Sequence, residues 1–536
     1  MSDARNPLLF TAMLLAASAW CEQHAPLNAP AQLERANKAW NEAKALGPKV
    51  HAALKSGGPA YLKLLDEQAA LYETAEQAFS EALHAGREDP YVLADYGLFA
   101  AERRKSVQAR MLLDAAVFAT RKPAGKDDAG KPLPEPPRLT AEKEALVCRA
   151  LGGLLERSGD NARACSRYRD AYRLWPGDPK NRLSLAIGLC ALGQPHEALS
   201  LLKPWADEAA KKADTEPLIA ALALYTLALA EEETGYPEDA LAHYRQARER
   251  AMSIDKNEGD NLGIADRAGL GAARLEDYFD SMQERSKNRA AENAARAEKK
   301  LPPLPDEREN YINAAQLCDQ GVRLKEQSLE DENFRIALSK ARRNSANITD
   351  DDLSKQPAFE TFAAGMQALQ AAIRRGPRMP RPYLELASCN VMLGRFGAAR
   401  KLLEEAAGCS PNSLAILHLY GEVLLELGQW EDALRVFTSA LGLEQESGRA
   451  NLGMARACAG LRSDARQCQA GLDALDRAEQ LGVRENAELR AQLADALRRF
   501  ERGEKPEPRK VIKGSGSRKG EQPTTPNVWS GTIFDK

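Results

Sequence analysis

Strand-forming residues are scarce in this sequence. Only 12 valines and 11 isoleucines occur among its 536 residues, whereas alanine, leucine, glutamate and arginine are abundant. The abundant residues favour helices, while β-branched residues favour strands. A parallel-sheet core also needs runs rich in valine and isoleucine, and no such run occurs. The composition therefore excludes Rossmann, TIM-barrel and β-sandwich folds for any large part of the chain and predicts an all-α protein.

An excess of positive charge is also missing. The formal net charge is −3, and charged residues of both signs, 28% of the chain, are interspersed along most of its length. A nucleic-acid-binding protein needs a basic face, which this distribution does not provide. We therefore expect no nucleic-acid partner.

The nine cysteines lack the spacing of a metal site. Their number is odd, no CxxC pair occurs, and histidine never clusters with cysteine at ligand spacing. Most of them stand beside apolar residues at helical spacing, as buried free thiols do. The pattern predicts no metal site and a reducing, cytoplasmic compartment.

Catalytic motifs are missing as well. The segment GSGSRKG at 514–520 lacks the preceding strand and following helix of a phosphate-binding loop. His196 and Glu197 do not begin an HExxH motif, because Ser200 stands where the second histidine would be. The six histidines are scattered, so no catalytic set can be nominated. We expect no enzymatic activity and no cofactor; the alternative is an active site within 256–345.

The N-terminal segment has two interpretations. Residues 7–19, PLLFTAMLLAASA, have the length of a signal-peptide apolar core and are too short to span a bilayer. However, the preceding residues are barely positive, and Asn6 followed by Pro7 is typical of a helix start. We expect an ordinary first helix, with an export signal as the alternative. No other stretch of the sequence is apolar enough to cross a membrane.

A period of 34 residues organises much of the chain. Small residues, large apolar residues and a glycine recur in the same order in several segments. The most complete series are Leu151, Gly152, Gly159, Ala164, Tyr168 and Ala171; Leu185, Ala186, Gly193, Ala198 and Leu202; Leu386, Ala387, Gly394, Ala399, Leu403 and Ala406; and Tyr420, Gly421, Gly428, Ala433, Phe437 and Ala440. This order predicts two antiparallel helices joined by a turn at the glycine, with neighbouring pairs stacked to bury their faces.

These segments resemble tetratricopeptide repeats. The strongest copy is SLAILHLYGEVLLELGQWEDALRVFTSALGL, residues 413–443, and the turns GQPHEAL, GYPEDAL and GQWEDAL follow the family pattern. The resemblance covers roughly 56–255 and 346–482. It implies an α-solenoid of helix hairpins that acts as a protein-binding scaffold.

Breaks in the pattern define the expected segments. We expect N-terminal helices at 1–55, first repeats at 56–121, a Pro-rich linker at 122–138 and further repeats at 139–255. A charged helical segment at 256–345 is either an insertion that splits the array or a set of divergent repeats, and its apolar residues fade after Met282. C-terminal repeats follow at 346–500. The composition of 501–536 predicts a disordered tail, whose ending NVWSGTIFDK is a possible docking motif.

The resemblance also implies a binding surface. In this family the first helices of successive repeats line a concave groove, and alignment places eleven side chains there. They are Tyr91, Arg149, Leu183, Tyr225, Leu229, Glu232, Ser388, His418, Glu422, Arg449 and Arg456. Their mixture of aromatic, apolar and charged types suits an extended peptide or a helix. Each of them could instead be an ordinary solvated helix position.

The clamp for chaperone C-termini is not expected, because Gly153, Ile187 or Ser388 would occupy one of its key positions. The sequence thus predicts a non-enzymatic adaptor with a protein partner and an unknown oligomeric state. The alternative is an exported form of the same architecture that works in envelope assembly.

Overall fold

The computed structural model describes residues 29–56, 59–121, 137–211, 216–254, 263–304, 307–343, 353, 355–484 and 486–504. Every element within these residues is a helix, which confirms the predicted all-α class. The signal-like segment at 1–19, most of the Pro-rich linker, the glycine-rich segment at 514–520 and the end of the tail lie outside them.

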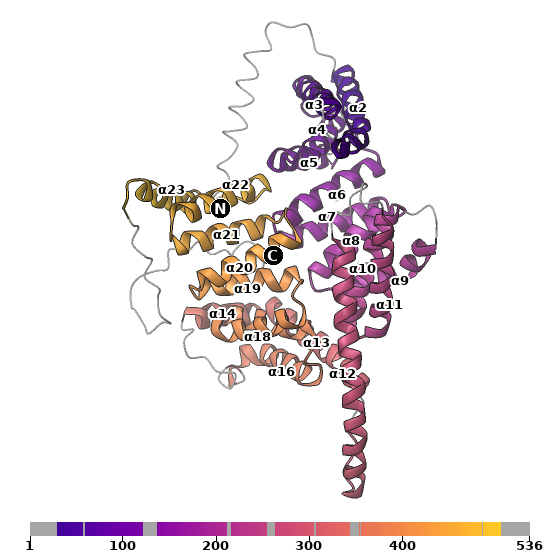
Figure 1. Cartoon of the computed structure of the whole chain (residues 1–536), viewed down its shortest axis with the longest axis vertical. Coiled ribbons are helices and arrows are strands. Elements are labelled where there is room, and N and C mark those ends of the chain that lie inside the picture. Colours follow the sequence, from indigo (N-terminus) through magenta and orange to yellow (C-terminus); the bar gives the residue numbers. More distant parts are fainter. Residues whose placement is uncertain are drawn as a thin grey trace, which may run out of the picture. The chain divides into compact units, whose positions relative to one another are not determined.

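The chain divides into two compact units. One comprises residues 1–154 and 167–177, and the other comprises residues 155–166 and 178–536. Both are built from helices that pair in chain order (Figure 1).

The first unit is built on two long paired helices, α2 (Ala29–Ser56) and α3 (Pro59–Ala85), and the hairpin of α4 (Pro90–Glu102) and α5 (Ser106–Arg121). Its core is aromatic: the rings of Phe79 and Tyr96 stack with centroids 5.4 Å apart, and Trp40 meets Phe99 edge-on at 5.8 Å. The unit also contains most of α6 (Ala141–Arg157) and part of α7 (Asn161–Leu174).

The second unit continues with two helix hairpins and a long helix. They are α8 (Pro179–Ala191) with α9 (Pro195–Lys211), α10 (Pro217–Thr234) with α11 (Pro237–Ser253), and α12 (Ile264–Glu298), which packs on α11. Only the first half of α12 is buried, and beyond Met282 none of its residues is buried. The second half of α12 extends away from the neighbouring helices (Figure 1).

The chain then returns through α13 (Glu307–Glu330), α14 (Glu332–Arg343), the short helix η2 (Pro357–Phe359) and α16 (Glu360–Arg375). Helices α13 and α16 pack closely, because Gly321 and Gly365 face each other; a Cβ on Gly321 would lie 2.9 Å from the carbonyl oxygen of Gly365. The segment at 256–345 therefore contributes α12 to the packing of α11 and α13 to a pair with α16.

The last repeats are the most regular. They comprise α17 (Pro380–Met392), α18 (Phe396–Cys409), α19 (Leu414–Glu426), α20 (Trp430–Leu443), α21 (Gly448–Leu461), α22 (Ala465–Gln480) and α23 (Ala487–Glu501). Helices α17, α19 and α21 begin 34 residues apart, as the sequence period predicts. Each helix packs on the next, and buried apolar clusters follow one another along the array.

The turns between paired helices need a left-handed residue. Gly394 and Gly428 have φ values of 75° and 70°, and Arg462, the next residue in the 34-residue series, has a φ of 42°. Glycine adopts this conformation without a steric penalty, whereas arginine does so with strain. The turn predicted at the repeat glycine therefore keeps its left-handed backbone conformation at Arg462, where arginine replaces the glycine.

Candidate functional site

The eleven predicted groove residues all lie on first helices of hairpins. Tyr91 is on α4, Arg149 on α6, Leu183 on α8, and Tyr225, Leu229 and Glu232 are on α10; Ser388 is on α17, His418 and Glu422 are on α19, and Arg449 and Arg456 are on α21. Nine of them are half-buried, and none of the eleven is fully exposed.

Two of these residues are not available to a partner. Leu183 is 5% exposed and packs with Ile219 and Ala223 in an apolar cluster. Glu232 is 4% exposed and forms an ion pair inside the second unit. Their assignment to an open groove is wrong, because the helices packed against α8 and α10 cover these side chains.

Two turns of α19 and the start of α21 bring three predicted residues together. Arg449 Nε donates to Glu422 Oε1 at 2.7 Å, and His418 Nε2 lies 3.3 Å from the Ser447 hydroxyl oxygen. Burial and the neighbouring Arg449 lower the pKa of His418 to about 4, against the opposite effect of Glu422. His418 is therefore neutral at physiological pH and has a hydrogen-bonding rather than a charged role.

Residues from the α6–α7 turn border this cluster. Arg157 Nη1 forms an ion pair with Glu446 at 3.1 Å, and a Cβ on Gly159 would lie 3.3 Å from Cβ of Arg449. Farther along, Arg267 Nη2 donates to the carbonyl oxygen of Leu443 at 2.8 Å. The C-terminal repeats thus contact earlier hairpins of the same unit through polar groups.

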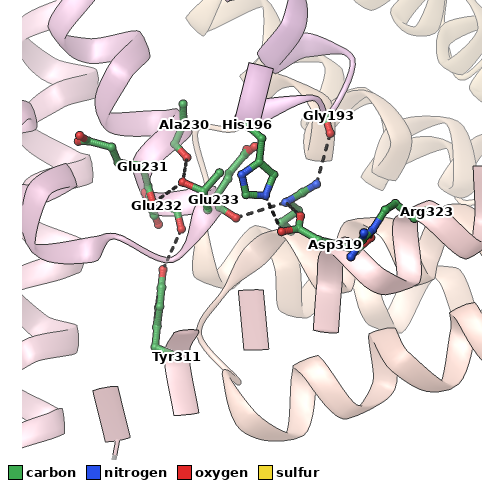
Figure 2. A network of polar contacts seen from close by, with 11 residues as sticks. Gly193, His196, Ala230, Glu231, Glu232, Glu233, Tyr311, Asp319 and Arg323 are labelled. Carbon is green, nitrogen blue, oxygen red and sulfur yellow. Dashed lines mark hydrogen bonds and ion pairs between the residues drawn. The ribbon is translucent and has the colours of Figure 1, made fainter. Parts of the chain in front are cut away.

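Three consecutive glutamates, Glu231, Glu232 and Glu233, lie in the last turn of α10 (Figure 2). Glu231 Oε2 lies 2.6 Å from His243 Nδ1 on α11. Glu232 accepts from Arg274 Nη2 at 2.6 Å and from the Tyr244 hydroxyl at 3.0 Å. The Tyr311 hydroxyl donates to the backbone oxygen of Glu232 at 3.4 Å.

The third glutamate belongs to a cluster centred on Arg381, at the start of α17. Arg381 is 6% exposed and donates to Asp319 Oδ1 at 2.7 Å and to the carbonyl oxygens of Gly193 and Glu233, both at 3.3 Å. His196 Nε2 lies 2.6 Å from the other oxygen of Asp319 (Figure 2). One guanidinium therefore joins α17 to the α8–α9 turn, the end of α10, and α13.

Sequence reasoning missed this cluster. Arg381 is 62 residues from Asp319 and 188 residues from Gly193, and no motif or period connects them. The only signal was the run of three glutamates at the C-terminal end of a helix, where the helix dipole disfavours negative charge and cationic partners are needed.

Chemistry at cysteines is suppressed by burial. Burial raises the pKa of Cys148 and of Cys389 to about 12 and that of Cys458 to about 11. A thiol with such a pKa is protonated at neutral pH and is a poor nucleophile. Within the described part of the chain, no group of His, Cys, Asp or Glu side chains could hold a metal ion.

A hollow of about 630 Å³ is open to solvent beside α18. It is lined by Gly397, Ala398, Arg400, Lys401, Leu427 and Gln429. These residues include no carboxylate, imidazole or thiol, so the hollow has no acid–base or nucleophilic group. Across the described residues, no helix is long and apolar enough to cross a membrane.

The described helices form an all-α array of stacked hairpins with a 34-residue period. Comparison with solved structures finds the TPR2AB-domain:pHSP90 complex of yeast Sti1, at 14% identity over 62% of this chain and 98% of that chain, with a TM-score of 0.21. It also finds a tetratricopeptide repeat protein from Parabacteroides merdae, at 14% identity over 69% of this chain and 98% of that chain, with a TM-score of 0.24. No family model matches the sequence, and no curated protein matches it.

Proposed function

We propose that this protein is a non-enzymatic scaffold that binds a peptide or helix of a protein partner along the first helices of its repeats. The observation that supports this most directly is the half-buried row of mixed side chains on α17, α19 and α21. Half-buried polar and charged positions on adjacent helices offer both contact area and hydrogen bonding to a bound segment.

The residues best suited to contact a partner are Ser388, Glu422, Arg449 and Arg456. Glu422 and Arg449 already form an ion pair, and Arg456 Nη2 lies 3.5 Å from Glu426 Oε1. When an extended chain binds, each of these charged side chains can exchange its ion-pair partner within the protein for a charged group of the bound chain. We also propose a cytoplasmic location, because thiols as numerous and as buried as these persist in a reducing compartment.

The test is an affinity capture of the full-length protein from its native cells with a charge reversal on the proposed surface. We expect Arg456→Glu to reduce recovery of a stoichiometric partner at least about tenfold, since a buried ion pair or hydrogen bond at an interface is worth about 1.4 kcal/mol or more. The matched control is Arg435→Glu on the second helix α20, where the side chain is exposed and paired with Asp432.

Equal recovery with Arg456→Glu and Arg435→Glu would contradict the proposed surface. Melting curves of both variants separate a lost contact from a lost fold. Tyr225→Ala is a poor probe, because Tyr225 packs against Tyr244 with ring centroids 5.9 Å apart and its loss should also lower stability.

A further inference from the structure

A short proline-rich segment follows the end of α12. Residues 301–304, which we name the proline segment, have the sequence Leu-Pro-Pro-Leu and precede Pro305. Proline fixes its own φ at about −65° and pushes the residue before it into an extended conformation. Leu301, Pro302 and Leu304 each precede a proline, and Pro303 is itself one, so the whole segment favours polyproline II. None of the four residues is helical in the structure, and Pro302 and Pro305 have the PxxP spacing.

Two side chains of α12 anchor the proline segment to that helix. Asn293 Nδ2 donates to the carbonyl oxygen of Leu304 at 3.2 Å, and the Leu304 amide donates to Asn293 Oδ1 at 2.7 Å. Arg296 Nε donates to the carbonyl oxygen of Pro302 at 2.9 Å. These three hydrogen bonds are made to backbone groups of the segment, so they fix its path without using its side chains.

The side chains of the proline segment are largely open to solvent. Leu301 is 47% exposed, Pro302 and Pro303 are exposed, and Leu304 is half-buried. The helix that carries the segment has no buried residue after Met282, and this half extends away from the neighbouring helices (Figure 1). A rigid, extended and apolar strip is therefore presented by the part of α12 that projects from the hairpins.

The residues around the start of the proline segment are mainly basic. Lys299 and Lys300 are exposed and directly precede it, and Lys300, with a φ of 53°, turns the chain out of the helix. With Arg296 they make three cations within residues 296–304, against one carboxylate, on Glu298. A surface that binds the segment is therefore complementary in charge if it carries carboxylates.

We propose that the proline segment is a docking site for a partner domain whose groove is lined with aromatic side chains and bordered by carboxylates. Such grooves bind polyproline II segments because the extended conformation is already formed before binding. The bonds from Asn293 and Arg296 restrict this segment further, so less conformational entropy is lost when the partner binds. This surface is separate from the first helices of the repeats, so the proposal goes beyond the proposed function.

Binding of the full-length protein to a panel of purified SH3, WW and EVH1 domains, which read proline-rich segments, tests this proposal. At least one domain should bind in biolayer interferometry. Pro302→Ala combined with Pro303→Ala should weaken this binding at least about tenfold, because the groove loses two rigid rings. The matched control is Pro134→Ala combined with Pro137→Ala, which changes a PxxP in the Pro-rich linker and should bind as the wild type does.

Three further variants leave all prolines in place. Lys299→Glu should weaken binding at least about threefold through repulsion from the carboxylates of the groove. Lys287→Glu makes the same charge change at an exposed position of α12 and should not weaken it. Asn293→Ala should weaken binding about threefold, because the segment loses two of its bonds to α12 and is less ordered before binding.

A panel in which no domain binds the wild type would overturn the proposal. Binding that survives Pro302→Ala with Pro303→Ala, or that is lost in the linker variant, would also overturn it, because the ligand would then lie elsewhere in the chain. Equal effects of Lys299→Glu and Lys287→Glu would contradict the carboxylate border of the groove. None of these results affects the proposed surface on the first helices, which is tested separately by Arg456→Glu.

Discussion

Glu232 and Glu233 are neighbours in the chain with opposite electrostatic environments. Glu232 is held by the guanidinium of Arg274 and the hydroxyl of Tyr244. Glu233 has three carboxylates close to it and shares its nearest cation with Asp319. One helix end therefore carries one carboxylate with a cationic partner and one whose pKa is raised by burial and by neighbouring carboxylates.

This difference predicts how the stability of the second unit depends on pH. The pKa of Glu233 is about 7 in the folded protein and 4.5 in the unfolded chain, so the folded state binds the proton more tightly. The resulting stabilisation is complete below about pH 4.5 and is lost as the pH rises through about 7. Glu233→Gln should therefore be more stable than the wild type at about pH 8, by on the order of 2 kcal/mol.

Thermal melting at several pH values measures this effect. The difference between Glu233→Gln and the wild type should be small at about pH 4.5 and should grow until about pH 7. A difference that is the same at all pH values would show that the glutamine acts by packing and not by its missing charge.

At the scale of the elements, glycines set how closely the helices approach. Gly421 of α19 and Gly453 of α21 both lie against the ring of Phe437 on α20. A Cβ on Gly421 would stand 2.5 Å from this ring, and one on Gly453 would stand 2.3 Å from it. The fully buried Phe437 thus fills a space that exists only because two neighbouring helices lack a side chain there.

Gly421→Ala should lower the free energy of unfolding by about 1–3 kcal/mol, because overpacking forces the helices apart, and Gly421→Leu should lower it further. Gly442→Ala is the control, since that glycine lies within α20 and has no atom near the position of a Cβ. There alanine should raise the free energy of unfolding by about 0.5–1 kcal/mol through its higher helix propensity. Denaturant titration of both variants measures the two changes, and a shared sign would contradict this description of the packing.

At the scale of the molecule, the two compact units should unfold in separate steps. Repeat proteins are stabilised mainly by contacts between neighbouring elements, so cooperativity decreases with distance along the chain. Phe79 lies in the first unit and Phe437 in the second, and both are fully buried. Replacing either by alanine should cost about 3–5 kcal/mol. In calorimetry each substitution should lower one transition temperature and leave the other unchanged; a common shift would mean that the chain melts as one unit.

The sequence predicted what depends on local spacing. The helix hairpins and the glycine turns at Gly394 and Gly428 follow from the period of 34, and the first-helix positions of the eleven groove residues follow from the resemblance to the repeat family. It did not predict what joins distant segments. The partner of Glu232 is Arg274, which lies outside the repeats, and Arg381 binds a carbonyl oxygen 188 residues away. No pattern in one sequence encodes such contacts, because they depend on how whole hairpins stack.

Photo-cross-linking in native cells tests the central claim, that first helices of the repeats hold a partner, most directly. A photoreactive amino acid at Ser388 on α17 should cross-link to a single protein partner, whereas the same group at the exposed Thr438 on the second helix α20 should not. Cross-linking at Thr438 but not at Ser388 would place the partner on the opposite face and contradict the account.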